Sequence, residues 1–242
     1  MKNIDILFGR MDAWRHLPNY QLERRADIFF SLYLPEVLEK HFSFPVKDVL
    51  VPEFPVHINT ISPDRPTDKS YKIDYVAFSE DGDRVFLVEL KTDDASRRGS
   101  QDIYLCKAKK EGLERLIDGQ KKIFMATAAK RKYFHLFDLL EKAGMVSIPD
   151  KMRVVMNRSN LQGLNELIRE ITYLGSPSEI HIVYVQPNDC REHKPDLSHD
   201  DKVSVITFKD FAEVVKSHND VVSQRFAQSL ETWASVIPGN NA

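Results

Sequence analysis

Three polar residues near the ends of two predicted strands could do chemistry together: Asp74, Glu89 and Lys91. Glu89 and Lys91 follow the apolar run 85–88, and strand alternation places both on one face. A hairpin between the two strands would bring Asp74 close to them. Two carboxylates and an ammonium group at the mouth of a buried sheet are costly unless a ligand binds there.

Oxygen ligands of this kind suit a hard divalent cation such as Mg²⁺, which keeps several of its waters. Asp74, Glu89 and the carbonyl oxygen of Leu90 would form such a partial metal site. Lys91 could orient an attacking water or neutralise charge that develops on a phosphate. The alternative is a salt-bridged strand end, in which Lys91 pairs with Asp74 or Glu89. The residues alone leave both interpretations open.

The elements around these residues are readable from the sequence. Asp81-Gly82 lies in a turn cluster and predicts a hairpin between the alternating stretch 71–76 and the apolar run 85–88. Before the hairpin, we expect a helix from Tyr20, which Pro35 kinks or restarts, and a first strand over 49–58. Residues 1–18 fit a strand or a helix equally well.

After the hairpin, apolar spacing predicts further helices and strands. The expected helices cover 101–116, 119–143, 161–174 and 208–233, the last with a break near 217–220, and the expected strands cover 153–156, 179–185 and 203–207. This order predicts an α/β protein with helices on both faces of a sheet.

Composition fits an ordinary soluble protein, with 42% hydrophobic and 29% charged residues, large enough for one domain or a domain with an appendage. We expect a single domain over residues 1–242. No apolar run approaches the roughly 20 residues of a membrane span, and the charged N-terminal stretch does not fit a signal peptide. Two cysteines, Cys106 and Cys190, make no disulfide framework or paired-cysteine metal site. We therefore expect a cytoplasmic protein with no membrane partner.

Charge is distributed unevenly along the chain. Residues 97–132 hold eleven Lys/Arg and four Asp/Glu, a balance of +7. Because the net charge of the chain is −2, the remaining residues together carry −9. A basic segment directly after an acidic strand end suits an enzyme that acts on a phosphate polymer. A solvated helix face would give the same charge pattern.

Two short motifs resemble the PD-(D/E)XK nuclease superfamily: Lys72-Ile73-Asp74-Tyr75 on one strand and Val88-Glu89-Leu90-Lys91-Thr92 on the next. Gln101-Asp102-Ile103-Tyr104 further resembles the Gln-x-x-Tyr motif of RecB-like members. The likeness covers roughly residues 20–120, and Ile73 stands where many members have proline. It implies a restriction-endonuclease-like core of helix, three strands, helix and strand over about 20–145, with additional C-terminal strands and helices over 146–242.

The resemblance also implies an activity, namely Mg²⁺- or Mn²⁺-dependent hydrolysis of phosphodiester bonds in nucleic acid, with DNA favoured over RNA. Asp74, Glu89 and the Leu90 carbonyl would bind the metal, and Lys91 would position or activate water. Glu23 would complete the acidic site. The implied nucleic-acid contacts are Gln101, Tyr104, Arg97, Arg98 and Lys107, with Lys109 and Lys110 as further basic residues.

Each of these assignments has a plainer alternative. Glu23 could be surface charge, with Asp27 the second choice for the acidic position on the first helix. Gln101 and Tyr104 could be a helix-surface amide and a packed aromatic ring. The whole domain could be a catalytically inactive module that binds nucleic acid or a protein. Residues 146–242 could extend the sheet, bind a partner or form a homodimer surface.

Other chemistry finds little support in the sequence. His16, His57 and His135 have no partner at metal-ligand spacing, so each is expected to be structural. A second Glu-x-Lys, Glu192-His193-Lys194, lies in a polar loop and carries no weight. With nine glycines in the chain, no glycine-rich phosphate loop or dinucleotide fingerprint appears.

Overall fold

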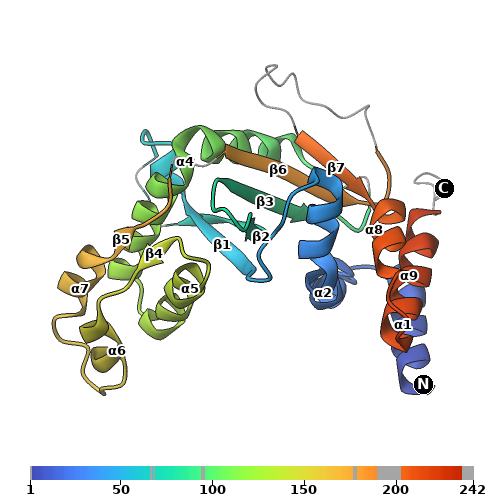
Figure 1. Ribbon diagram of the computed structural model, residues 1–242, viewed down its shortest axis with the longest axis horizontal. Coiled ribbons are helices and arrows are strands. Elements are labelled where there is room, and N and C mark those ends of the chain that lie inside the picture. Colours follow the sequence, from blue (N-terminus) through green and yellow to red (C-terminus); the bar gives the residue numbers. More distant parts are fainter. Residues whose placement is uncertain are drawn as a thin grey trace. The chain divides into compact units, whose positions relative to one another are not determined.

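The computed structural model describes residues 2–65, 67, 69–93, 96–176, 179–189 and 203–235 (Figure 1). They form an α/β protein with a five-stranded mixed sheet in the order β1-β2-β3-β6-β7. The strands are β1 (Val51–His57), β2 (Ser70–Phe78), β3 (Arg84–Leu90), β6 (Glu179–Gln186) and β7 (Val203–Thr207). A separate pair joins β4 (Val146–Ser147) to β5 (Thr172–Tyr173).

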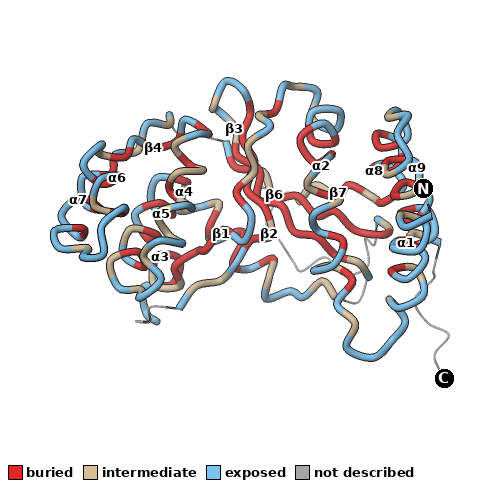
Figure 2. Tube along the Cα trace, turned by 90° about the horizontal axis from the view of Figure 1, so that it is seen from below, coloured by how far each residue is buried: buried red, intermediate tan, exposed pale blue. Residues whose placement is uncertain are grey.

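Strand directions follow from the hydrogen bonds. β1 and β2 are antiparallel, with Phe54 opposite Ile73. Along β3 and β6, Glu179 N donates to Asp83 O at one end and Lys91 N donates to Val185 O at the other. Because the partners advance together, β3 and β6 are parallel, which makes the sheet mixed. Buried residues dominate these strands (Figure 2), as the apolar run in β3 predicts.

Nine helices lie in the described part of the chain. They are α1 (Lys2–Trp14), α2 (Glu23–Phe42), α3 (Ile58–Ile61), α4 (Gly99–Ala126), α5 (Lys130–Lys142), α6 (Asp150–Met156), α7 (Leu164–Glu170), α8 (Phe208–Val215) and α9 (Val221–Ala234). None of the helices in those residues is both long and apolar enough to span a bilayer.

The chain divides into two compact units. The first contains residues 1–46, 88–102 and 183–242, and the second contains 47–87 and 103–182. The expectation of one nuclease-like domain over 1–242 stays a prediction.

The first unit has an aromatic core. Phe30 of α2 lies 5.5 Å from Phe208 and 5.1 Å from Phe211 of α8, and 5.2 Å from Phe226 of α9, between ring centroids. Phe8 of α1 joins this cluster through Phe226 at 6.0 Å. The spacing of apolar residues on the first helices thus buries one face of each against the C-terminal helices.

Helix ends in this unit are set by short polar side chains. Thr207 and Asp210 form a reciprocal capping box at the start of α8. Asp220 caps α9 by accepting from the backbone N–H groups of Val222 and Ser223. The expected break in the last helix near 217–220 is therefore confirmed, and its cause is this second cap.

The second unit is built on the hairpin. Ser79 N donates to Arg84 O at 3.1 Å, and Gly82 takes φ of +78° in the turn, so the hairpin predicted from Asp81-Gly82 is confirmed. α4 contacts β1 through Gln120, whose side-chain Nε2 donates to the Pro55 carbonyl at 3.2 Å.

Several expectations about elements are wrong. Residues 153–156 lie in helix α6 rather than a strand; Pro149, directly before the helix, has a fixed φ compatible with helix entry. The helix expected over 161–174 is only Leu164–Glu170, followed by β5. The helical stretch after the hairpin continues to Ala126, interrupted at Gly112 (φ 82°, ψ 158°) rather than near residue 118.

His181 on β6 provides a test of the second unit's packing. Its ring stacks on Phe86 at 5.4 Å between centroids. Burial is the largest cause that lowers the pKa of His181 below its ordinary 6.5; the negative charge of Glu179 opposes it, and the positive charges of Lys109 and Arg84 reinforce it. The unfolded chain therefore takes up a proton below pH 6.5 that the folded chain resists, so stability is full above this pH and falls below it.

We predict that His181→Phe makes the loss of unfolding free energy between about pH 7 and about pH 5 less steep. Phenylalanine keeps the stacking on Phe86 and cannot be protonated. Urea unfolding at a series of pH values measures this slope. An unchanged slope would show that His181 does not contribute to it.

Gly119 of α4 lies close to Thr60 of α3 and His57 of β1. A Cβ at this position would lie 2.4 Å from Thr60 Oγ1 and 3.1 Å from His57 Cβ. We predict that Gly119→Ala lowers the free energy of unfolding by about 1–3 kcal/mol, because overpacking forces the neighbours apart. Gly99→Ala is the matched control, since a Cβ there meets nothing within 4 Å. Equal stability of the two variants in chemical denaturation would contradict the prediction.

Candidate functional site

Glu89 and Lys91 occupy the end of β3 in the first unit. Both are buried, with exposed fractions of 1% and 4%, and Lys91 Nζ lies 3.1 Å from Glu89 Oε2. The contact agrees with the expectation that both side chains share a face of the strand. It is also the contact that the salt-bridged alternative expects, so the pair by itself does not separate the two interpretations.

Gln101 joins this pair from the first turn of α4. Its side-chain Nε2 donates to Glu89 Oε2 at 3.2 Å, so two donors converge on the same carboxylate oxygen. The other amide atom, Gln101 Oε1, is buried and has no hydrogen-bond partner within the described residues. Sequence reasoning placed Gln101 near the site only through the resemblance; the structure brings it to Glu89.

Arg97 was expected to contact phosphates, and its side chain is only 7% exposed. The guanidinium donates to Asp102 Oδ1 from Nε at 3.3 Å and from Nη2 at 3.1 Å. Its central carbon lies 4.2 Å from the ring centroid of Tyr184. In this structure the guanidinium therefore faces a carboxylate and an aromatic ring, while Arg98 is exposed.

Asp102 and Tyr184 are two residues of this site that sequence reasoning missed. Asp102 is 1% exposed and Tyr184 is fully buried. Burial, reinforced by the carboxylates of Asp102 and Glu89, raises the pKa of Tyr184 well above its ordinary value, so its hydroxyl stays protonated. An acidic residue beside Gln101 and five residues after Arg97 was a usable signal for Asp102. No local pattern marks Tyr184.

The second unit holds the remaining expected residues of the hairpin. Asp74 is half-buried between the buried Ile73 and Tyr75 of β2. Lys72 is exposed and pairs with Glu53 at 2.7 Å. Glu53 itself adopts φ of +50°, a left-handed value that is uncommon for a residue with a side chain.

Tyr104 is packed in the second unit rather than displayed on a helix surface. It is 6% exposed, its hydroxyl donates to the Lys72 carbonyl at 3.1 Å, and its ring stacks on Tyr71 at 4.6 Å with an interplanar angle of 4°. Lys107, one turn further along α4, is exposed and donates to Ser62 Oγ at 2.9 Å. Contacts of Tyr104 and Lys107 with nucleic acid stay predictions.

Glu23, the acid chosen for the first helix, is the first residue of α2 and is half-exposed. Asp27, the second choice, is exposed one turn later. Both belong to the first unit. Membership of Glu23 in the acidic site stays a prediction.

Metal binding at the expected ligands stays a prediction. No group of three or more His, Cys, Asp or Glu side chains able to hold a metal occurs in the described part of the chain. Mg²⁺ commonly uses only one or two protein carboxylates and completes its shell with waters and phosphate oxygens. The Glu89 carboxylate and the Leu90 carbonyl, both in the first unit, are oxygen donors of this kind, and the part of Asp74 as a ligand stays a prediction.

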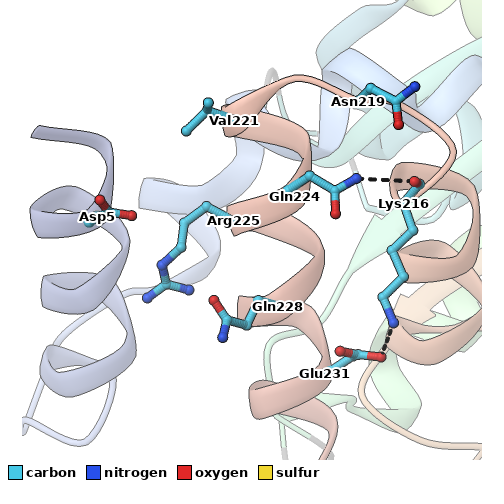
Figure 3. A pocket seen from close by; sticks show the side chains of 8 residues that line it. All are labelled: Asp5, Lys216, Asn219, Val221, Gln224, Arg225, Gln228 and Glu231. Carbon is cyan, nitrogen blue, oxygen red and sulfur yellow. Dashed lines mark hydrogen bonds and ion pairs between the residues drawn. The ribbon is translucent and has the colours of Figure 1, made fainter. Parts of the chain in front are cut away.

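A hollow of about 490 Å³ lies elsewhere in the first unit (Figure 3). Arg225 and Gln228 of α9 line it together with Lys216, which forms an ion pair with Glu231. Arg225 in turn pairs with Asp12 of α1 at 2.5 Å. Both basic side chains that line the hollow therefore have acidic partners, and none of the expected site residues lines the hollow.

Comparisons with known proteins assign the chain to no family. No family model, no curated protein and no solved structure matches the chain. Function must therefore be argued from the residues of the site.

The packing of Tyr104 is open to a direct test. We predict that Tyr104→Phe lowers the free energy of unfolding by about 0.5–1.5 kcal/mol, because it removes the hydrogen bond to the Lys72 carbonyl and keeps the ring. Tyr104→Ala should cost more, since the stacking on Tyr71 is lost as well. Thermal and urea unfolding measure both changes. A Phe variant as destabilised as the Ala variant would contradict this division.

Proposed function

We propose that this protein is a metal-dependent nuclease that uses Mg²⁺ or Mn²⁺ to hydrolyse phosphodiester bonds in nucleic acid, with DNA favoured over RNA. The observation that carries the proposal is the buried Glu89–Lys91 pair with Gln101 at the end of β3. Burying a carboxylate and an ammonium group is costly, and replacing such a pair by apolar residues is often neutral or stabilising. A role in catalysis is a reason to keep them there.

The order of elements supports the same proposal. A helix (α2), three strands (β1, β2 and β3), a helix (α4) and a later strand (β6) follow one another along the chain, with short α3 inserted after β1. This order resembles the restriction-endonuclease-like core of the PD-(D/E)XK superfamily. In that core the residues matching Asp74, Glu89 and Lys91 form the catalytic motif.

Each side chain then has a distinct role. Asp74, Glu89 and the Leu90 carbonyl would hold the metal ion, which supplies Lewis-acid polarisation of the phosphate and a more acidic bound water. Lys91 orients the attacking water and neutralises charge on the phosphate. Gln101 orients the Glu89 carboxylate through its hydrogen bond. Glu23 is the proposed additional acid, and Arg98 and Lys107 are proposed phosphate contacts that would make binding salt-dependent.

One observation favours a second candidate, a catalytically inactive module that binds nucleic acid or a protein partner. The charges of Glu89 and Lys91 compensate one another without a metal, and so do those of Arg97 and Asp102. A binding module needs no more than this from its buried charges. Titration with Mn²⁺ separates the two candidates, because only the nuclease requires a metal to bind at Glu89.

We predict that the protein cleaves labelled nucleic acid in the presence of Mg²⁺ or Mn²⁺ and that Glu89→Gln and Lys91→Met each lower the rate by at least about 100-fold. Gel assays with single-stranded DNA, double-stranded DNA and RNA measure the rate. Circular dichroism must show that both variants fold, because each leaves a buried charge without its partner.

Lys216→Met is the matched control for this experiment. It removes a lysine of the same unit from an ion pair with Glu231, and its side chain is 46% exposed. The control should cleave at the wild-type rate. Absence of metal-dependent cleavage by the wild type on all three substrates, together with absence of Mn²⁺ binding, would reject the nuclease in favour of the binding module.

A further inference from the structure

We propose that Arg97, Asp102 and Tyr184 form a group of positioning residues, named here the Arg97 clamp. The clamp holds the side-chain amide of Gln101 against the Glu89 carboxylate. The inference rests on the proposed nuclease function for its catalytic meaning, and its geometry stands independently. All five residues belong to the first unit of the chain.

In the clamp, the Arg97 guanidinium contacts a carboxylate and an aromatic ring. Asp102 Oδ1 accepts from two nitrogens of Arg97, and the ring of Tyr184 lies 4.2 Å from the guanidinium carbon. The guanidinium is thus held by a carboxylate and, through a cation–π contact, by an aromatic ring. With exposed fractions of 7% for the Arg97 side chain and 1% for that of Asp102, water offers little competition for these contacts.

The clamp acts at the residue next to Gln101. Asp102 and Gln101 are consecutive in the first turn of α4, so a fixed Asp102 fixes the backbone from which Gln101 projects. Gln101 Nε2 then reaches Glu89 Oε2 at 3.2 Å, the oxygen that also accepts from Lys91. Tyr184 supplies the clamp's attachment to β6, whose residue Val185 accepts from the backbone N–H of Lys91.

This arrangement gives Arg97 and Asp102 a role in setting the orientation of a metal-binding carboxylate. Groups that orient a metal ligand typically change metal affinity or activity by about 10–100-fold when they are removed. Arg97, Asp102 and Tyr184 need not touch substrate or metal to have this effect; they are positioning residues that work through Gln101.

The first unit contains a matched control for the clamp. Arg225 pairs with Asp12 at 2.5 Å, and its guanidinium carbon lies 5.6 Å from the ring centroid of Phe8. This is also an arginine between a carboxylate and an aromatic ring, and these two partners lie on α1 rather than on β3 or α4. Asp12 also accepts from Trp233 Nε1 at 2.9 Å, so Asp12→Asn reports the cost of disturbing a part-buried carboxylate and its donors elsewhere in the unit.

The test compares Asp102→Asn with Asp12→Asn in ¹⁵N–¹H spectra of the metal-free protein, in which Gln101→Ala identifies the Gln101 side-chain amide. We expect Asp102→Asn to move this signal toward that of a free amide and to raise its solvent exchange, and Asp12→Asn to leave it unchanged. If Asp102→Asn does not fold, the double variant Arg97→Met/Asp102→Leu replaces it, because it leaves no unpaired charge buried.

A Mn²⁺ titration of the same variants tests the consequence for the site. We expect Asp102→Asn to weaken Mn²⁺ binding by about 10–100-fold and to have little further effect in a Gln101→Ala background, since the clamp works through Gln101. An unchanged Gln101 signal in the clamp variant overturns the proposal, as does full additivity of the two substitutions. If the wild type binds no Mn²⁺, the proposed nuclease function fails, and the Gln101 signal alone decides whether the clamp positions the amide.

Discussion

Glu89, Lys91 and Gln101 form the polar centre of the first unit, and its organisation depends on the buried ion pair between Lys91 and Glu89. Neither charge could remain at this depth alone, because an isolated buried charge costs several kcal/mol after relaxation. The pair therefore depends on the extended backbone at the end of β3, because strand alternation places both side chains on one face. It also draws in Gln101, whose amide shares the same carboxylate oxygen with Lys91. The Glu89 carboxylate thus holds both donors in place, and the two hydrogen bonds compensate part of the cost of burying its charge.

Much of the fold was accessible from the sequence because its signals are local. The Asp81-Gly82 turn, the continuous apolar run of β3, and the alternation of β6 each lie within a few residues. Where local signals conflict, prediction failed. Residues 153–156 resemble a short strand, yet they complete a helix that Asp150 begins, and three consecutive apolar residues cannot distinguish the two. The first helix, α1, was undecidable for the same reason.

The candidate site shows the same division. The proximity of Glu89 and Lys91 follows from the period of a strand, and the sequence predicts it without further information. The bond from Gln101 to Glu89 spans twelve residues, and the family resemblance predicted only that Gln101 lies near the site. Tyr184 lies more than eighty residues beyond Arg97, and nothing in its neighbourhood indicates that it supports a guanidinium. Long-range partners of this kind depend on tertiary packing, which local patterns do not encode.

The aromatic core of the first unit has a consequence for how the protein is made. Phe8 and Phe30 leave the ribosome early, whereas their partners Phe208 and Phe226 are about two hundred residues later in the chain. Contacts of such long separation form slowly, and a nascent helix with an uncovered apolar stripe is prone to association. Lys91 donates its backbone N–H to Val185 and Arg97 lies over the ring of Tyr184, so the segment that carries Glu89, Lys91 and Gln101 gains these supports only after β6 has been synthesised. Nascent chains would therefore lack both the closed aromatic core and this support of Glu89, Lys91 and Gln101 until the residues after 180 have been synthesised.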